Sequence, residues 1–187
     1  MSTLDSLESM ATLPIRQFGD PVLRQKAKEV ERVTDAHRRL VADMIETMRE
    51  APGVGLAGPQ IGVLERVFVW EVDEEHGAVF NPVIVERSDE EIESEEGCLS
   101  LPGLYYPVTR SVSVTVEGLD EHGDPVTLEG DELLARVCQH EMDHLDGVLF
   151  IDHLTDDLRK EALTVLRDQA LGLGPPPARR KPLEEQL

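Results

Sequence analysis

The chain has 187 residues, 40% of them hydrophobic, which is enough for one globular domain that buries its own core. Its net charge of −20 argues against unassisted binding to nucleic acid or to an anionic membrane, because phosphates would be repelled. The opening MSTLDSLESMATLP lacks the basic start of a signal peptide, no apolar run is long enough to span a bilayer, and two cysteines make no disulfide framework, so we expect a cytoplasmic protein.

Two helical segments are predicted in the first third of the chain. Asp20 followed by Pro21 is an N-cap and N1 pair that starts a short helical turn. Thr34 can cap a helix over residues 35–50, and Pro52 ends it. Apolar side chains at helical spacing predict a core-facing stripe on this helix: Leu40, Val41, Met44, Ile45 and Met48.

The middle of the chain is typical of antiparallel strands. Residues 66–72, 78–86 and 110–119 are rich in β-branched and aromatic side chains, with turn-forming residues between them. Residues 120–124, DEHGD, indicate a hairpin loop after the last of these strands. The acid-rich stretch 86–96 is expected to be a solvated hairpin or edge strand rather than a cation site.

Two more helices are predicted after the strands. Asp131 can cap a helix over residues 132–146, and Gly147 suits its stop. Thr155 can cap a helix over residues 156–171, whose inward side chains would be Leu158, Ala162, Leu163 and Leu166.

The order of these elements predicts an α+β fold, in which antiparallel β-sheets pack around a central helix, with additional N- and C-terminal helices. We expect a single domain over residues 1–171. From residue 172 the composition shifts to proline and charge, which predicts a flexible C-terminal tail over 172–187.

The predicted helix 132–146 carries the sequence HEMDH. His140 and His144 lie one turn apart, about 40° from each other around the axis, so both imidazoles can meet one metal ion. Glu141 flanks them and can reach a water without ligating the metal. The alternative is a pair of exposed helical histidines beside acids.

A catalytic site needs a third protein ligand. One common solution places a third histidine six residues after the second, but that position is Phe150 here, and His153 lies three residues farther along. Another solution uses a glutamate on the following helix, and Glu161 could serve, although nothing in its surroundings singles it out. Cys138 lies about 200° around the helix from His140 and faces away, so we expect it to be a buried thiol. Cys98 lies beside turn-forming residues, and nothing in its position prevents its side chain from facing the two histidines. One thiolate and two imidazoles suit Zn²⁺ or Fe²⁺.

Three stretches together resemble the signature motifs of the peptide deformylases, in the family's order and approximate spacing: GVGLAGPQIG at 53–62, EGCLS at 96–100 and QHEMDHLDG at 139–147. PIRQFGDPVLR at 14–24 is similar to the start of that family, and the resemblance covers residues 14–165. It implies a hydrolase that removes the formyl group from the N-terminal formylmethionine of newly made polypeptides.

The resemblance implies the roles of six residues. Cys98, His140 and His144 would be the metal ligands, and Glu141 the general acid and base. The Gln60 side-chain amide, assisted by the Leu99 backbone N–H, would donate to the developing oxyanion. The chemistry agrees with these roles, because neutral, preorganised donors stabilise a tetrahedral oxyanion best.

The residues expected to contact the substrate follow the family pattern less closely than the metal ligands do. Gly55 would lie at the substrate-facing backbone, and the expected apolar walls are Val54, Leu56, Leu101 and residues of the 131–146 helix. Ala57 is followed by Gly58 where the family motif usually has a second alanine. The segment after EGCLS lacks the arginine that many members carry, so Tyr105 or Tyr106 would occupy that region.

The family implies Fe²⁺ as the native ion, while Zn²⁺, Ni²⁺ or Co²⁺ can occupy the site. The expected partners are N-formylmethionyl nascent peptides at or near the ribosome, met by a monomer that binds neither nucleic acid directly nor membrane. Docking on the ribosome would have to rely on a small local feature such as the basic run Arg179 to Lys181, but the favoured interpretation of that segment is a solvated, disordered end. Two alternatives stay open, namely an HExxH peptidase with another third ligand and a metal-binding relative without catalysis.

Overall fold

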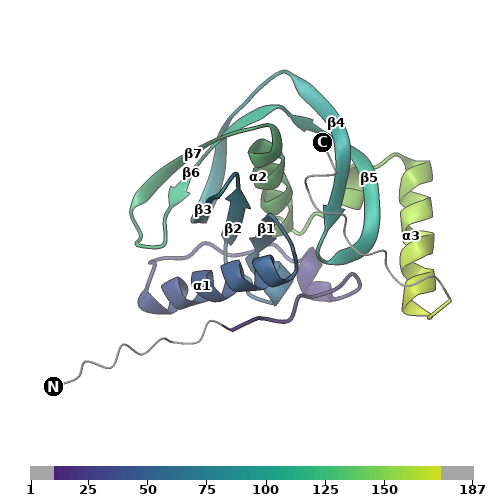
Figure 1. Cartoon of the computed structure of the whole chain (residues 1–187), viewed down its shortest axis with the longest axis horizontal. Coiled ribbons are helices and arrows are strands. Elements are labelled where there is room, and N and C mark those ends of the chain that lie inside the picture. Colours follow the sequence, from purple (N-terminus) through teal and green to yellow (C-terminus); the bar gives the residue numbers. More distant parts are fainter. Residues whose placement is uncertain (1–10, 174–187) are drawn as a thin grey trace.

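A computed structural model of the chain describes residues 11–173 (Figure 1). Helix α1 (Asp35–Glu50) begins where the backbone N–H of Thr34 donates to Nδ1 of His37 at 2.9 Å, and it ends before Pro52 as predicted. Its buried face carries Val41, Met44 and Met48, while Leu40 and Ile45 are half-buried beside them. The predicted stripe of this helix is therefore confirmed.

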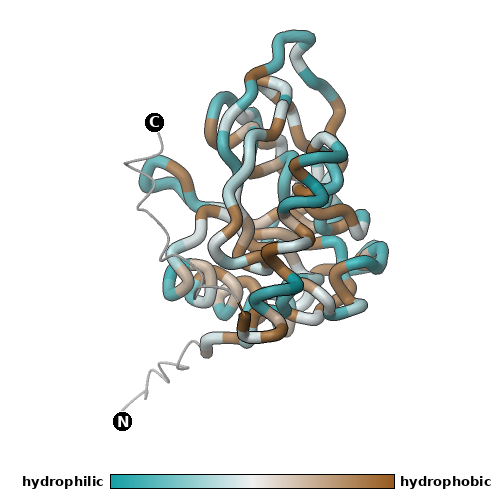
Figure 2. Tube along the Cα trace, turned by 90° about the vertical axis from the view of Figure 1, so that its right-hand side faces the viewer, coloured by the Kyte–Doolittle hydropathy of each residue, from teal (hydrophilic) through white to brown (hydrophobic). Residues whose placement is uncertain are grey.

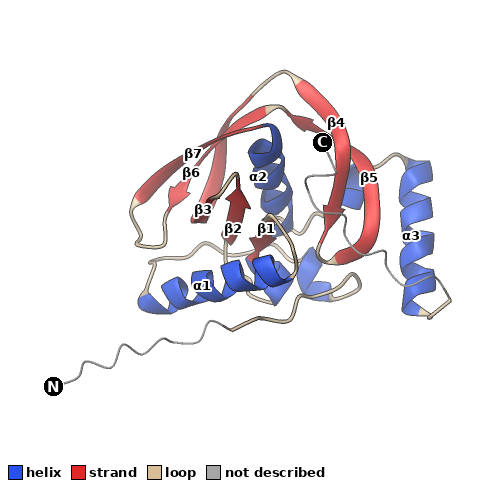
Figure 3. Ribbon diagram, viewed as in Figure 1, coloured by secondary structure: helices blue, strands red, loops and turns tan. Residues whose placement is uncertain are grey.

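The larger of the two sheets has five antiparallel strands (Figure 3). Its order is β1-β2-β3-β6-β7, with the bounds β1 (Gly55–Ala57), β2 (Val67–Val72), β3 (Glu75–Arg87), β6 (Ser113–Leu119) and β7 (Pro125–Asp131). The β6–β7 loop is closed by a bond from Asp120 N–H to Asp124 O at 2.9 Å. The antiparallel pairing and the hairpin loop at 120–124 are confirmed.

Strand β2 is buried on both faces, because each face meets a different helix. Val67 and Val69 pack in one core cluster with residues of α1, whereas Phe68 and Trp70 pack in another with residues of α2 (Glu132–Leu145). The period of two in a strand therefore divides the apolar run VFVWEV between two cores.

A separate two-stranded sheet joins β4 (Glu91–Cys98) to β5 (Leu101–Ser111). The prediction of one strand over 110–119 is wrong, because the pairing of β5 with β4 ends at Ser111 and β6 begins only at Ser113, after a break at Val112. The N–H of Val112 donates to Glu90 O and its carbonyl accepts from Glu132 N–H, both at 2.9 Å. The acidic stretch does supply the edge strand β4, although one of its acids, Glu96, is buried.

Helix α2 lies between the two sheets (Figure 1). Asp131 stands at its N-cap position, but the side chain makes no capping hydrogen bond. Gly147 follows its end with a φ of +74°, and a Cβ there would lie 2.7 Å from Arg24 O. Both the left-handed conformation and this close approach require glycine, as the predicted helix stop implies.

Helix α3 (Asp156–Ala170) packs on the β4–β5 sheet through one side only. Ala162 and Leu166 are buried, and Leu158 is half-buried. The expectation that Leu163 faces inward is wrong, since it is 40% exposed, because it is turned about 100° from Ala162 around the axis. Three 3₁₀ turns complete the described elements: η1 (Pro21–Arg24), η2 (Gly58–Ile61) and η3 (Phe150–His153).

Hydrophilic residues concentrate at the outer turns of the trace and hydrophobic ones in its interior (Figure 2). Among the described residues, no helix combines the length and the apolar character that crossing a membrane requires. Of the predicted tail, only Gly172 and Leu173 belong to the described part, and residues 174–187 lie outside it. The single domain over 1–171 stays a prediction.

Candidate active site

Three predicted ligand atoms meet between the two sheets. Cys98 is the last residue of β4, and its Sγ lies 3.2 Å from Nε2 of His144 on α2. The Nε2 atoms of His140 and His144 are also 3.2 Å apart, and the three donor atoms lie within 4.8 Å of one another. All three side chains are buried. The three atoms come together because His140 and His144 lie one turn apart on α2 and Cys98 lies at the end of β4.

Cys98 reaches this point because β4 is irregular at its end. The register shifts after Gly97, which pairs with Tyr105, so that Cys98 pairs with Leu101 across a tight turn. Burial alone would raise the pKa of the Cys98 thiol, but the charges and hydrogen bonds of His144 and His140 outweigh it and hold that pKa well below its ordinary value. A thiolate and two imidazole nitrogens held this closely fit a divalent cation of borderline softness.

A buried carboxylate that the sequence reasoning did not single out lies behind the cluster. Oε1 of Glu96 contacts Nδ1 of His140, the ring nitrogen turned away from Cys98. Arg110 donates to both Glu96 oxygens, at 3.1 and 2.9 Å, and Arg136 adds a bond at 3.3 Å. Burial opposes its charge, yet His140 and Arg110 hold the pKa of Glu96 far below its ordinary value. Glu96 therefore fixes the ring of His140.

Arg110 also connects the strand-borne and helix-borne parts of the site. Its second contact is to Asp143 Oδ2 at 2.7 Å, and Asp143 lies on α2 between the two histidines. His153 Nε2 meets the same carboxylate oxygen at 2.7 Å, so this histidine belongs to the supporting ion pairs and not to the ligand cluster. The acid before Gly97 in the EGCLS stretch was the one sequence signal that could have indicated this network.

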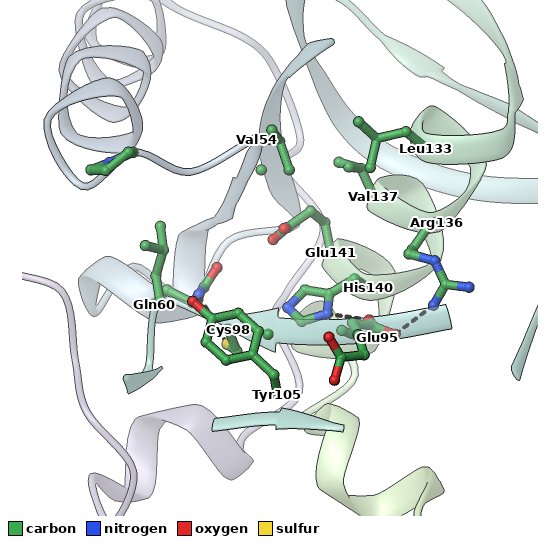
Figure 4. A pocket seen from close by; sticks show the side chains of 15 residues that line it. Val54, Gln60, Glu95, Cys98, Tyr105, Leu133, Arg136, Val137, His140 and Glu141 are labelled. Carbon is green, nitrogen blue, oxygen red and sulfur yellow. Dashed lines mark hydrogen bonds and ion pairs between the residues drawn. The ribbon is translucent and has the colours of Figure 1, made fainter. Parts of the chain in front are cut away.

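Glu141 lies on α2 with its carboxylate in the cavity beside the cluster (Figure 4). Its Oε2 atom is buried and has no hydrogen-bond partner among the described residues. Burial raises the pKa of Glu141 to about 7, against the opposing charges of His140 and His144. The carboxyl is therefore poised to accept or release a proton near neutral pH.

Gln60 is held in one orientation by its own turn. In η2, its Oε1 accepts from the N–H of Ala57 at 2.9 Å, which turns Nε2 toward the opposite side. Nε2 donates to Ser100 Oγ at 3.3 Å and lies 3.7 Å from Cys98 Sγ. A neutral amide donor thus lies beside the Cys98 thiol, and the bond from Ala57 fixes its orientation.

A cavity of about 90 Å³ opens in front of these groups. Of the predicted substrate residues, Val54, Gly55 and Tyr105 line it, together with Gln60 and Leu99. Helix α2 adds an apolar wall of Leu133 and Val137, and Arg136 and Glu95 stand at the side (Figure 4).

Other candidates lie elsewhere. Leu56 and Leu101 are fully buried in core clusters and do not line the cavity, because alternation along a strand turns Leu56 away from the face of Gly55. Cys138 is buried in the core as expected, and burial raises its pKa to about 12. Glu161 accepts from the Tyr106 hydroxyl at 3.0 Å, so neither residue faces the cluster.

Comparison with known proteins gives one consistent result. A family model described as polypeptide deformylase matches residues 12–160. A peptide deformylase of Acidothermus cellulolyticus is 54% identical over 159 residues, which are 85% of this chain and 88% of the relative. One of Neisseria gonorrhoeae is 50% identical over 149 residues, 78% of this chain and 89% of the relative.

Solved structures agree with these matches. The crystal structure of peptide deformylase from Thermus thermophilus superposes with a TM-score of 0.80 at 48% identity, covering 87% of this chain and 97% of that one. The enzyme from Ehrlichia chaffeensis in complex with actinonin gives a TM-score of 0.82 at 36% identity, over 86% and 98% of the two chains.

Proposed function

Because the chain belongs to the polypeptide deformylase family, and so is a metal-dependent hydrolase that removes the formyl group from N-terminal formylmethionine, we propose that Cys98, His140 and His144 hold its metal ion. The observation that carries this assignment is the approach of the Cys98 Sγ atom to both imidazoles, next to the unpartnered oxygen of Glu141.

We propose Fe²⁺ as the native ion, with Zn²⁺, Ni²⁺ or Co²⁺ able to replace it, since one sulfur and two nitrogen donors suit these borderline cations. When bound, a divalent ion supplies Lewis acidity, which lowers the pKa of water and polarises a carbonyl oxygen. The chain's own part is to keep Cys98 as a thiolate and His140 in one orientation, the latter through Glu96.

Glu141 is the proposed general base and acid. Its free Oε2 would take a proton from the water that attacks the formyl carbon, and it would later deliver that proton to the leaving amine nitrogen. The C–N bond of the formamide breaks, and the products are formate and a free N-terminal amine. A pKa of about 7 suits a group that must both accept and give up a proton near neutral pH.

Gln60 and Leu99 are the proposed oxyanion donors. The Gln60 amide is turned toward Cys98 by its bond from Ala57, and Leu99 directly follows the ligating cysteine. Two neutral donors next to the metal ligands would stabilise the negative oxygen of the tetrahedral intermediate, and one such donor contributes about 10²–10³ in rate.

The strand topology supports an extended conformation for the bound peptide. β1 is an edge strand of the five-stranded sheet and β4 belongs to the two-stranded sheet, and they border the cavity through Gly55 and Gly97. A peptide lying between them would place its methionine side chain against Val54, Leu133 and Val137, with Tyr105 on the other side. The substrate would be a formylated nascent chain near the ribosome, met by a monomer in the cytoplasm.

The test is to replace Glu141 by alanine and by glutamine and to measure formate release from formyl-Met peptides together with metal content. We expect release to be lost in both variants while one metal per chain remains bound. Unchanged release by either variant would remove Glu141 from the mechanism. Cleavage of internal peptide bonds that survives Cys98→Ser would instead favour a peptidase with a different third ligand.

A further inference from the structure

The segment before η1, residues 13–18, crosses two turns that carry site residues. We call it the N-terminal strap, and it runs below α1 toward η1 in Figure 1. The backbone N–H of Arg16 donates to the carbonyl of Gln60 at 2.7 Å. Two residues later, the N–H of Phe18 donates to the carbonyl of Ser100 at 2.8 Å.

Side chains anchor the strap at both ends. Leu13 and Ile15 pack on the core cluster that contains Ile61 and is also contacted by Leu99. Phe18 packs on the different cluster that contains Cys98 and Leu101. The strap thus joins the core beneath the Gln60 turn to the core beneath the Cys98 turn, and Gln17 between the two bonds is exposed.

The two turns need such a connection because they belong to different sheets. Gln60 lies in η2, which follows β1 of the five-stranded sheet, whereas Leu99 and Ser100 form the turn of the two-stranded sheet. The Gln60 side chain itself reaches across with long contacts only, 3.3 Å to Ser100 Oγ and 3.7 Å to Cys98 Sγ. The two bonds of the strap, at 2.7 and 2.8 Å, are shorter and come from one continuous backbone.

We propose that Arg16 and Phe18 are positioning residues, whose backbone N–H groups set the separation of Gln60 from the Cys98–Leu99–Ser100 turn and thereby align the two oxyanion donors. This inference rests on the proposed oxyanion role of Gln60 and Leu99. An error of about 1 Å in the placement of a reacting group can cost on the order of 100-fold in rate, so two backbone bonds at this distance suffice to matter.

Proline substitution removes a backbone N–H, and alanine at the same position removes only the side chain. The experiment compares Arg16→Pro with Arg16→Ala, and Phe18→Pro with Phe18→Ala, in metal-loaded full-length enzyme. Gln17→Pro compared with Gln17→Ala is the register control, because the backbone N–H of Gln17 makes no bond to either turn, and the alanine variant accounts for the loss of the side-chain bond from Gln17 Nε2 to Leu99 O at 3.4 Å. Metal content and thermal midpoint show whether each variant is folded, and kcat and KM are measured on a formyl-Met peptide.

We expect each proline variant to lose about 10- to 100-fold in kcat relative to its alanine partner, with KM and metal content unchanged. The loss should be clearly smaller in a Gln60→Ala background, because one of the two donors that the strap aligns is already missing. A strap that only stabilises the fold would give the same loss in both backgrounds, and this outcome overturns the inference. Full kcat in both folded proline variants overturns it as well.

The Arg16 and Phe18 pairs test the two bonds separately, so an unfolded Phe18→Pro leaves the Arg16 pair decisive. The failure of the proposed function looks different from the failure of this inference. If Gln60→Ala itself retains full activity, the oxyanion assignment is wrong, whereas a Gln60→Ala loss without any effect of the proline variants rejects the strap alone.

Discussion

At the scale of single residues, the Glu141 carboxylate can occupy its position only because residue 55 is a glycine, which has no side chain. A Cβ atom on Gly55 would lie 2.3 Å from Glu141 Oε1 and 2.9 Å from Val137 Cγ1. Gly55→Ala must therefore displace the carboxylate that we assign as the base. We expect kcat/KM to fall by about 100-fold, as a shift of roughly 1 Å implies.

Steady-state kinetics and metal content check this prediction. Val54→Ala is the matched control, because it shortens a neighbouring cavity wall without adding an atom next to Glu141. We expect that control to raise KM more than it lowers kcat. A Gly55→Ala enzyme with the activity of the unaltered protein would mean that the position of Glu141 is not critical.

Glu96 gives a second prediction at this scale, because it holds the ring of His140. Glu96→Gln keeps the size of the side chain but removes the charge that faces His140, Arg110 and Arg136. Loss of such a partner behind a ligating histidine typically lowers metal affinity about 10- to 100-fold. Competition with a chelator measures the affinity.

The control for this substitution is Glu95→Gln, one residue earlier in β4. Glu95 is exposed and makes no ion pair in the part of the chain that the structure describes. We expect its metal affinity to stay unchanged. Equal affinities of the two variants would show that charge near the site, and not the contact with His140, determines metal binding.

A comparison of the helix-borne residues with Glu96 shows which parts of a site a sequence can predict. The pairing of His140 with His144 and the direction of Cys138 away from them follow from helical geometry, which is local. The role of Glu96 depends on Arg110 and Arg136, which lie 14 and 40 residues away, and no local pattern brings them together. The motif contained Glu96, but only the fold gives it a function.

At the scale of elements, the same contrast appears in the strands. The alternation of Val112, Val114 and Val116 predicts one continuous strand, and two of the three valines are buried as such a pattern requires. The break at Val112 comes from bonds to Glu90 and Glu132, which are distant in sequence. The helices were easier to predict, because capping and stop residues act within one turn.

Asp152 in η3 connects its own turn to η1 and α3. Its carboxylate accepts from Leu149 N–H at 2.9 Å and pairs with Arg24 of η1 and Arg159 of α3. Burial opposes its charge, but the hydrogen bonds from Arg24 and Leu149 lower its pKa in the folded protein. We expect Asp152→Asn to cost about 1–2 kcal/mol of unfolding free energy at pH 7, which is less than buried hydrogen bonds to charged groups contribute, because solvent screens the exposed arginine partners.

The pH dependence follows from the lowered pKa. A carboxyl whose pKa is lower in the folded than in the unfolded state stabilises the fold above its unfolded value, about 4, and loses this contribution as the pH falls below it. The difference between Asp152→Asn and the unaltered protein should therefore shrink between pH 5 and roughly 3 in urea unfolding. Asp89→Asn, an exposed control, should show no such trend. A difference that stays constant with pH would contradict the ion-pair account.

At the scale of the whole molecule, the site lies where two sheets and a helix between them meet. The α+β class and the central helix could be predicted from the order of the elements. More than one sheet was also predicted, but the point at which one sheet ends and the other begins could not be, because it depends on the bonds of Val112 and on the burial of Arg110 with Glu96. The resemblance in three motifs supplied the convergence that topology alone would have left open.

Charge is the property of the whole chain that leads to the last prediction. There are 38 acidic and 18 basic side chains, so even complete pairing leaves 20 carboxylates without a cation. Such an excess destabilises the compact state by repulsion, and at physiological ionic strength salt screens the repulsion between exposed charges that lie more than about 8 Å apart. Salt also weakens exposed ion pairs such as Arg49–Glu71, but these contribute little.

We therefore expect the thermal midpoint to rise as KCl is added from low ionic strength to about 0.15 M, by roughly 2–4 °C for each 1 kcal/mol of relieved repulsion. Replacing Glu91 and Glu93, two exposed acids of β4, by glutamine should raise the midpoint at low salt and reduce its salt dependence. Scanning calorimetry of both proteins over a KCl series measures the two effects together. A midpoint that falls with KCl would mean that the surface ion pairs outweigh the excess of acid, and a double variant with an unchanged salt response would place the repulsion elsewhere on the molecule.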